Sequence, residues 1–334
     1  MRASPPCQCC RCSPPRFSPS LSLSHETAVR PARHAGSFSA TLLPAPRLFH
    51  SRRHHLLPAR TAEREALHAR LPPFRLARSS SSGSSSQGRA RPLDVRAYRV
   101  GSLDAVYYIS DYVSEAEEAQ IKLQLEASPA EMWQSMQGRR VQECGSRMAA
   151  DGRGLVLETL PPWMQSVCAR LVDDGIFPPT AAPNSVALNE YSAQQGIAPH
   201  ADGPVYAPRV AILSLFSPAL LRFYGKQPEL EAHLAWDEST DTPAHATGGG
   251  QPLECLLLQP RSLLLFVGDA FREHCHEVAA CPEGREVAGD AQSGTLVNGA
   301  LAGAQPGDPV VRGERVSLTI RHLLEFLLAV EEEG

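Results

Sequence analysis

Six short apolar runs after Pro183 constrain the fold of this chain more than any other feature. Each run is six to nine residues long, and Pro, Gly and polar turn residues separate the runs from one another. Runs of this length are typical of strands. They are VALNEY (186–191), RVAILSLF (209–216), ALLRFYG (219–225), LECLLLQ (253–259), RSLLLFVG (261–268) and RVSLTIRHL (315–323). The pattern favours a β-sandwich or jelly roll.

Two segments before these runs have the pattern of amphipathic helices. In 114–128, Ser114 and Glu117 stand at capping-box spacing. In 160–175, a Pro-Pro pair suits the first turn, and Gly175 stands where a helix-ending glycine would. Helices that precede a series of short strands predict an α+β fold, with the helices packed outside the β core.

Two polar segments rich in Gly, Ala and Asp interrupt the series of runs. We interpret 237–251 and 281–309 as loops inserted between strands. No run approaches the eighteen uninterrupted apolar residues that a membrane span requires, so we expect no membrane partner.

The charge distribution divides the chain into a basic head and an acidic body. Residues 1–100 hold 17 Arg, no Lys and 4 acidic residues, a net charge of +13, whereas the other 234 residues carry a net charge of −17. The head is rich in Ser, Pro and Arg and has no sustained apolar period, which predicts disorder over 1–93. An ordered domain is then expected over 94–334.

The head also has the composition of an organellar transit peptide, which is Arg-rich, Ser-rich and poor in acidic residues. The whole chain, however, contains 30 Arg and 2 Lys, so codon bias explains the same enrichment. Both interpretations stay open.

The stretch IAPHADGPVY (197–206) places His200 and Asp202 two residues apart. On a strand, this spacing directs an imidazole and a carboxylate to the same side. The triplet alone is common on protein surfaces, so it becomes informative only when a third ligand is found.

A third ligand is available in FREHCHEVAA (271–280), which offers His274 and His276 just beyond a predicted strand and turn. One of these histidines, joined to His200 and Asp202, completes the two-histidine, one-carboxylate face of non-haem Fe(II) oxygenases. The alternative is that both are surface histidines of a loop.

The last apolar run carries two arginines. In RVSLTIR (315–321), Arg315 and Arg321 share one face of a strand with Ser317 and Thr319. Inside a jelly roll, two guanidiniums require an anionic partner, and a bound dicarboxylate would supply one. The alternative is an edge strand with its arginines in water.

The first of the six runs offers two more polar groups. Asn189 and Tyr191 lie on one side of the strand that precedes His200. Their amide and phenol are suited to hydrogen-bond the same dicarboxylate.

Taken in chain order, N-x-Y, H-x-D, a histidine after a strand and turn, and R-x-S-x-T-x-R resemble the AlkB family of Fe(II)/2-oxoglutarate dioxygenases. The resemblance covers roughly residues 95–325, and stretches such as LNEYSAQQGIAPHADGPVYAP and LLLQPRSLLLF are most similar to the AlkB homologue six subgroup. It implies a double-stranded β-helix (jelly-roll) core with flanking N-terminal helices. The implied iron ligands are His200, Asp202 and His276, and the implied 2-oxoglutarate contacts are Asn189, Tyr191, Arg315 and Arg321.

The same resemblance implies Fe(II), 2-oxoglutarate and O2 as cofactor and cosubstrates, and oxidative demethylation as the reaction. Its implied substrate is an alkylated base in DNA or RNA, flipped into a pocket. A body of net charge −17 repels phosphate, so the head or a local patch at 138–140 would have to provide attraction.

Two alternatives stay open: the same chemistry on a protein substrate, and a metal-binding jelly roll without oxygenase activity. We expect a monomer in the cytoplasm and nucleus, or in the chloroplast or mitochondrion if residues 1–93 act as a transit peptide.

Overall fold

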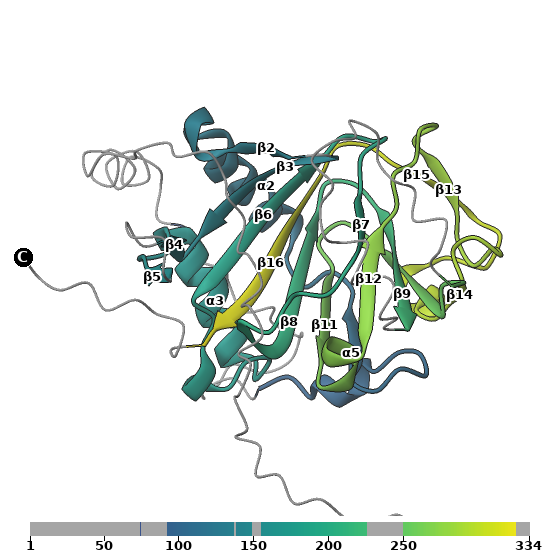
Figure 1. Cartoon of the computed structure of the whole chain (residues 1–334), viewed down its shortest axis with the longest axis horizontal. Helices are drawn as coiled ribbons and strands as arrows, with labels where there is room; N and C mark the ends of the chain where they lie inside the picture. Colours follow the sequence, from purple (N-terminus) through teal and green to yellow (C-terminus); the bar gives the residue numbers. More distant parts are fainter. Residues whose placement is uncertain (1–73, 75–91, 137, 149–154, 226–249, 325–334) are drawn as a thin grey trace, which may run out of the picture. The chain divides into compact units, whose positions relative to one another are not determined.

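Two β-sheets form the centre of the described part of the chain in the computed structural model (Figure 1). The structure describes residues 74, 92–136, 138–148, 155–225 and 250–324. These residues belong to one compact unit, Leu56–Gly334. The expected extension over 1–93 lies outside the described residues, apart from Phe74, Pro92 and Leu93.

The larger sheet has seven strands in the order β1-β11-β8-β16-β6-β3-β2, and each neighbouring pair is antiparallel. Its central strand is β16, between β8 and β6, so the alternative of an edge strand for 315–321 is wrong. The strands are β1 (Val106–Ile109), β2 (Gln134–Met136), β3 (Arg139–Cys144), β6 (Ser185–Tyr191), β8 (Tyr206–Leu215), β11 (Leu263–Val267) and β16 (Arg315–Leu323).

The smaller sheet has five strands in the order β14-β10-β9-β12-β7, antiparallel except for the pair β10 and β14. Its strands are β7 (Ile197–His200), β9 (Ala219–Gly225), β10 (Glu254–Leu258), β12 (His274–Val278) and β14 (Thr295–Leu296). From β8 the chain passes to the smaller sheet for β9 and β10, returns to the larger sheet for β11, and passes again to the smaller sheet for β12. This mixed α+β arrangement of two mainly antiparallel sheets is consistent with a double-stranded β-helix.

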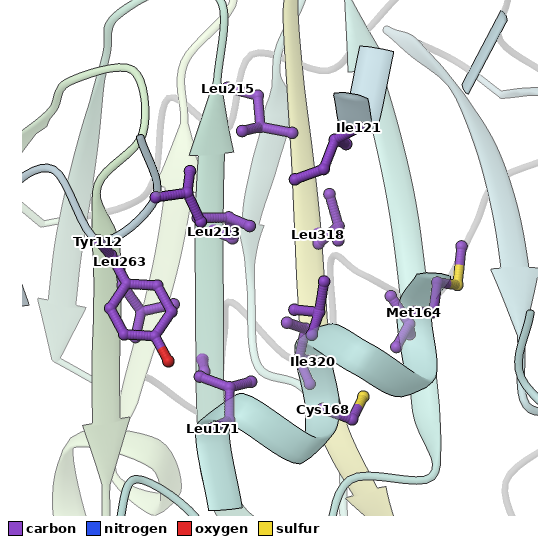
Figure 2. Packing of buried hydrophobic residues seen from close by; sticks show 14 of the residues in the cluster. Tyr112, Ile121, Met164, Cys168, Leu171, Leu213, Leu215, Leu263, Leu318 and Ile320 are labelled. Carbon is purple, nitrogen blue, oxygen red and sulfur yellow. The ribbon is translucent and has the colours of Figure 1, made fainter. Parts of the chain in front are cut away.

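Two hydrophobic cores define three layers. One core lies between the helices and the larger sheet, where alternate residues of β16, Val316, Leu318 and Ile320, are at most 5% exposed (Figure 2). The other lies between the two sheets and contains residues such as Phe266 of β11 and Phe223 of β9. The opposite face of β16 is thereby left to polar side chains.

Both predicted helices are confirmed. Helix α2 (Glu115–Glu126) begins with a complete capping box, in which Ser114 accepts from the Glu117 amide and Glu117 accepts from the Ser114 amide. Helix α3 (Pro162–Asp173) ends before Gly175, whose φ of 76° favours glycine. Other short helical turns are η1 (Val95–Tyr98), η2 (Ala130–Met132), η3 (Pro179–Ala181) and α5 (Asp269–Arg272).

The segment 281–309 has more structure than the loop expected from its composition. It contains β13 (Arg285–Val287), β14 and α6 (Gly299–Ala302), and β13 pairs with β15 (Pro309–Val311). Small residues of this segment, such as Ala288 and Ala302, are buried against the core between the sheets. The other expected loop, 237–251, lies outside the described residues except for its last two positions.

Two hairpins were not predicted. Strand β2 pairs with β3, and β4 (Ser146–Met148) pairs with β5 (Leu155–Leu157). No helix in the described part of the chain is long and apolar enough to cross a membrane.

Candidate active site

The polar face of β16 forms one wall of a cavity of about 170 Å³. Arg315, Ser317, Thr319 and Arg321 all line this cavity, as their spacing predicted. The two arginines are only 2% and 8% exposed, so neither guanidinium lies in water. Their charge therefore has to be compensated by the protein or by a ligand.

The smaller sheet supplies the opposite wall. His200 ends β7 and faces His276 of β12 across an antiparallel pair, with ring centroids 4.4 Å apart. Asp202 follows β7, and its Oδ2 lies 3.6 Å from Nε2 of His276. His274 is not among the lining residues, and its Nδ1 donates to the Asp269 carbonyl at 3.1 Å. The structure thus brings His276, not His274, to His200 and Asp202.

Both imidazoles are held in the neutral form that binds metals. Nδ1 of His200 lies 2.8 Å from the Ala198 carbonyl, which can only accept, so the free lone pair is on Nε2. Burial lowers the pKa of His200. Burial and the adjacent His200 lower the pKa of His276 to about 3.

Asp202 carries a buried oxygen that lacks a hydrogen bond. Its Oδ1 accepts from Nη1 of Arg321 at 2.8 Å, whereas Oδ2 has no partner in the described structure, although the side chain is 3% exposed. Burial acts to raise the pKa of Asp202, but the nearby Arg321 guanidinium holds it below its usual range. An ionised, unpaired oxygen beside neutral imidazoles is an environment that a divalent cation would satisfy.

In the side-chain arrangement seen here, no three His, Cys, Asp or Glu donors among the described residues converge in coordinating geometry. The donor set nevertheless fits a metal such as Fe(II) by its chemistry. It combines two imidazole nitrogens with one carboxylate oxygen, and the ion pair of Asp202 with Arg321 occupies only one of the two carboxylate oxygens.

The two cavity arginines of β16 differ in their partners. Arg321 pairs with Asp202 and lies 3.9 Å from Glu143. Arg315 donates to Ser214 Oγ at 2.9 Å and lies over the ring of Tyr191, and its Nε is buried without a partner in the described structure. Burial lowers the pKa of Arg315 to about 10. Within the described ranges, Arg315 forms no ion pair with a carboxylate, which leaves its guanidinium available to an anionic ligand.

Strand β6 places Asn189 and Tyr191 in the same cavity, as predicted. Asn189 is 7% exposed and its Oδ1 accepts from Nε of Arg139 at 2.8 Å. Arg139 and Glu143 of β3 also line the cavity. The sequence did not predict a role for Arg139 or Glu143 in the site, because their strand, β3, has no run of apolar residues by which it could be predicted.

The patch expected at 138–140 does not offer two free arginines. Arg139 turns toward the cavity, as described above. Arg140 lies over the ring of Trp133 and forms a bidentate ion pair with Glu190, at 2.5 and 2.7 Å. The Glu190 carboxylate thus neutralises the outward-facing charge of the patch.

The cavity therefore joins two kinds of binding group. Neutral imidazoles and an unpaired carboxylate oxygen on one wall suit a divalent cation, and an unpaired guanidinium on the other suits an organic acid. With this fold, the pairing defines an oxidoreductase of the 2-oxoglutarate-Fe(II) oxygenase class.

A comparison of sequences identifies the family within that class. The chain is 35% identical over 240 residues to "Probable RNA/DNA demethylase ALKBH6" of Danio rerio, a match that spans 72% of this chain and 94% of the relative. The chain belongs to the AlkB family of 2-oxoglutarate-Fe(II) oxygenases. The family implies Fe(II) and 2-oxoglutarate. No family model matches the chain.

Similar solved structures are more distant. "The structure of OsALKBH1" gives a TM-score of 0.41 at 12% identity and covers 67% of this chain and all of that one. A 2OG-Fe(II) oxygenase family oxidoreductase from Burkholderia pseudomallei gives 0.37 at 14% identity and covers 66% of this chain and 84% of that one.

Proposed function

We propose that His200, Asp202 and His276 hold the Fe(II) of this oxygenase. The proposed donor atoms are Nε2 of each histidine and Oδ2 of Asp202. The observation that supports this assignment most strongly is the buried Asp202 oxygen, which has no hydrogen-bond partner in the described structure and lies beside the neutral His276 ring. Two histidines and one carboxylate leave three neighbouring positions of an octahedral metal for other ligands.

The same proposal assigns the opposite wall to 2-oxoglutarate. Arg315 would bind the carboxylate far from the metal, because its buried guanidinium has no acidic partner and an unpaired Nε in the described structure. Asn189 and Tyr191 would donate further hydrogen bonds to 2-oxoglutarate. Arg321 would contact 2-oxoglutarate and Asp202 at the same time. A guanidinium suits this task because its planar fork matches a carboxylate.

When bound, iron and 2-oxoglutarate supply an oxidation in which dioxygen is consumed, succinate and carbon dioxide form, and a substrate C–H bond becomes C–OH. On an N-methyl group, the hydroxylated carbon leaves as formaldehyde. The residues of this chain would orient the cosubstrate and keep both imidazoles neutral in a buried site.

We propose an alkylated nucleic acid as the substrate. The support is the name of the zebrafish relative, a probable RNA/DNA demethylase. The acidic body, with a net charge of −17 outside the first 100 residues, favours a methylated protein as the second candidate, because phosphate is repelled by such a surface.

Formaldehyde release separates these two substrate classes. The full chain, supplied with Fe(II), 2-oxoglutarate and dioxygen, would be incubated with N-methylated DNA and RNA oligonucleotides and with methylated peptides. We expect formaldehyde from an oligonucleotide and not from the same oligonucleotide without methyl groups. Release from peptides alone would replace the nucleic-acid proposal with the protein one.

For localisation we propose the cytoplasm and nucleus, which rests on family resemblance. A reporter fused to residues 1–93 tests it. Import of that reporter into chloroplasts or mitochondria would replace this proposal with that of a transit peptide.

A further inference from the structure

Arg139 contacts the cavity from a strand that contributes no residue to the proposed iron and 2-oxoglutarate set. By the register of β3 on β6, Arg140 is opposite Glu190 and Val141 is opposite Asn189. Arg139 therefore lies diagonally across from Asn189, on the cavity side of the sheet. Its Nε donates to Oδ1 of Asn189 at 2.8 Å, and Asn189 is 7% exposed.

This hydrogen bond determines which way the Asn189 amide points. A guanidinium donates and cannot accept, so the amide atom that faces Arg139 has to be the oxygen. The Nδ2 group is then turned toward Thr319, whose Oγ1 is 3.4 Å away and which also lines the cavity. An N–H donor is thereby presented where a carboxylate or keto oxygen would bind.

The other neighbours of the amide hold this orientation weakly. The Thr319 hydroxyl can donate or accept, so it tolerates both orientations. The Ala187 carbonyl lies 3.5 Å from Nδ2, at the limit of a hydrogen bond. Without Arg139, the amide is free to turn its oxygen toward a bound anion, which would repel it.

We propose that Arg139 is a positioning residue that fixes the Asn189 amide with its N–H donors toward bound 2-oxoglutarate. The inference rests on the proposed function, since it requires 2-oxoglutarate in this cavity. It adds a residue of β3 to a site otherwise built from β6, β7, β12 and β16. Arg139 acts through Asn189, so its contribution should vanish when the amide is absent.

Calorimetric titration of 2-oxoglutarate into the full chain loaded with Mn(II) tests the proposal without turnover. We expect Arg139→Met to weaken 2-oxoglutarate binding by about five- to tenfold, because the hydrogen bond that orients the buried Asn189 amide is lost. Arg139→Lys keeps a donor-only group and should bind more tightly than Arg139→Met. The matched control is Arg140→Met, which removes the neighbouring arginine from the opposite face and should bind as the wild type does.

A double-mutant cycle separates positioning from direct contact. If Arg139 acts through Asn189, the variant Arg139→Met/Asn189→Ala binds 2-oxoglutarate as weakly as Asn189→Ala alone. If the two losses multiply, Arg139 contacts the ligand itself and the proposal is wrong. Circular dichroism of each variant verifies that the fold is retained.

The remaining outcomes also discriminate. If the wild type binds 2-oxoglutarate and Arg139→Met binds it equally tightly, this inference is wrong and the proposed function stands. Absence of 2-oxoglutarate binding by the wild type would overturn both.

Discussion

Arg315 and Arg321 are six residues apart on one face of β16, and their surroundings give them different roles. Arg321 neutralises the buried Asp202, whereas Arg315 has a hydroxyl and an aromatic ring as neighbours and a buried Nε without a partner in the described structure. One guanidinium therefore stabilises the metal-free fold, and the other adds a buried charge that a bound anion would offset.

Replacement of each arginine by methionine should separate these roles. Arg321→Met leaves Asp202 buried without its counter-ion, so the free energy of unfolding of the metal-free protein should fall by about 3–5 kcal/mol. Arg315→Met should leave it unchanged or raise it, yet weaken 2-oxoglutarate binding at least about tenfold, or about 1.4 kcal/mol. Urea unfolding and calorimetric titration measure the two quantities. Equal losses of stability in both variants would contradict the distinction.

For single residues, the sequence predicted which side chains share one face of a strand, and the structure gives their hydrogen bonds and ion pairs. The i,i+2 spacings of H-x-D, N-x-Y and R-x-S-x-T-x-R indicate a shared face, because side chains alternate along a strand. The choice between His274 and His276 depends on the pairing of β12 with β7, which local spacing does not encode. Arg139 reaches the cavity from β3, a strand without the apolar run that would predict it.

Element by element, the strands with continuous apolar runs were the easiest to predict. Strands β9 and β16 match their predicted runs residue for residue. The Gly, Ala and Asp content of segment 281–309 predicts a loop. The segment is held instead by a buried ion-pair network, in which Glu286 accepts from Arg222 of β9 at 3.0 Å and lies 3.8 Å from Arg312. Such pairing depends on tertiary structure and leaves no periodic pattern.

Removal of Glu286 should destabilise the protein strongly. In Glu286→Leu, Arg222 and Arg312 lose a buried carboxylate, and the Leu220 amide loses its acceptor at 3.1 Å. We expect the free energy of unfolding to fall by about 3–5 kcal/mol. Urea unfolding measures the change. The control is Glu283→Leu in the same insertion, an exposed position where a change within about 0.5 kcal/mol is expected. Similar effects of the two variants would show that the network does not anchor the insertion.

For the whole molecule, the clearest feature of the sequence is its uneven distribution of charge. The first 100 residues carry a net charge of +13 and the rest −17. The fold of the body accounts for the proposed chemistry, because both cavity walls lie between residues 139 and 321. We therefore propose that the head contributes to polymer binding and not to 2-oxoglutarate turnover.

Truncation tests this division. A chain that starts at Pro92 should turn over 2-oxoglutarate much as the full chain does. It should bind a nucleic-acid oligonucleotide more weakly at low salt, and the difference should shrink as added salt screens the charges. Succinate formation and fluorescence anisotropy measure the two activities. Equal oligonucleotide affinity of both chains at low ionic strength would show that the head is not an electrostatic arm.

The most direct test of the iron assignment compares two histidines that are two residues apart. We predict that His274→Ala binds Mn(II) with wild-type affinity and forms succinate from 2-oxoglutarate when loaded with Fe(II). We predict that His276→Ala loses both, because it removes one of three proposed ligands. Calorimetric titration with Mn(II), followed by the succinate assay with Fe(II), gives both readouts. Wild-type metal binding by His276→Ala, or its loss in His274→Ala alone, would contradict the site described here.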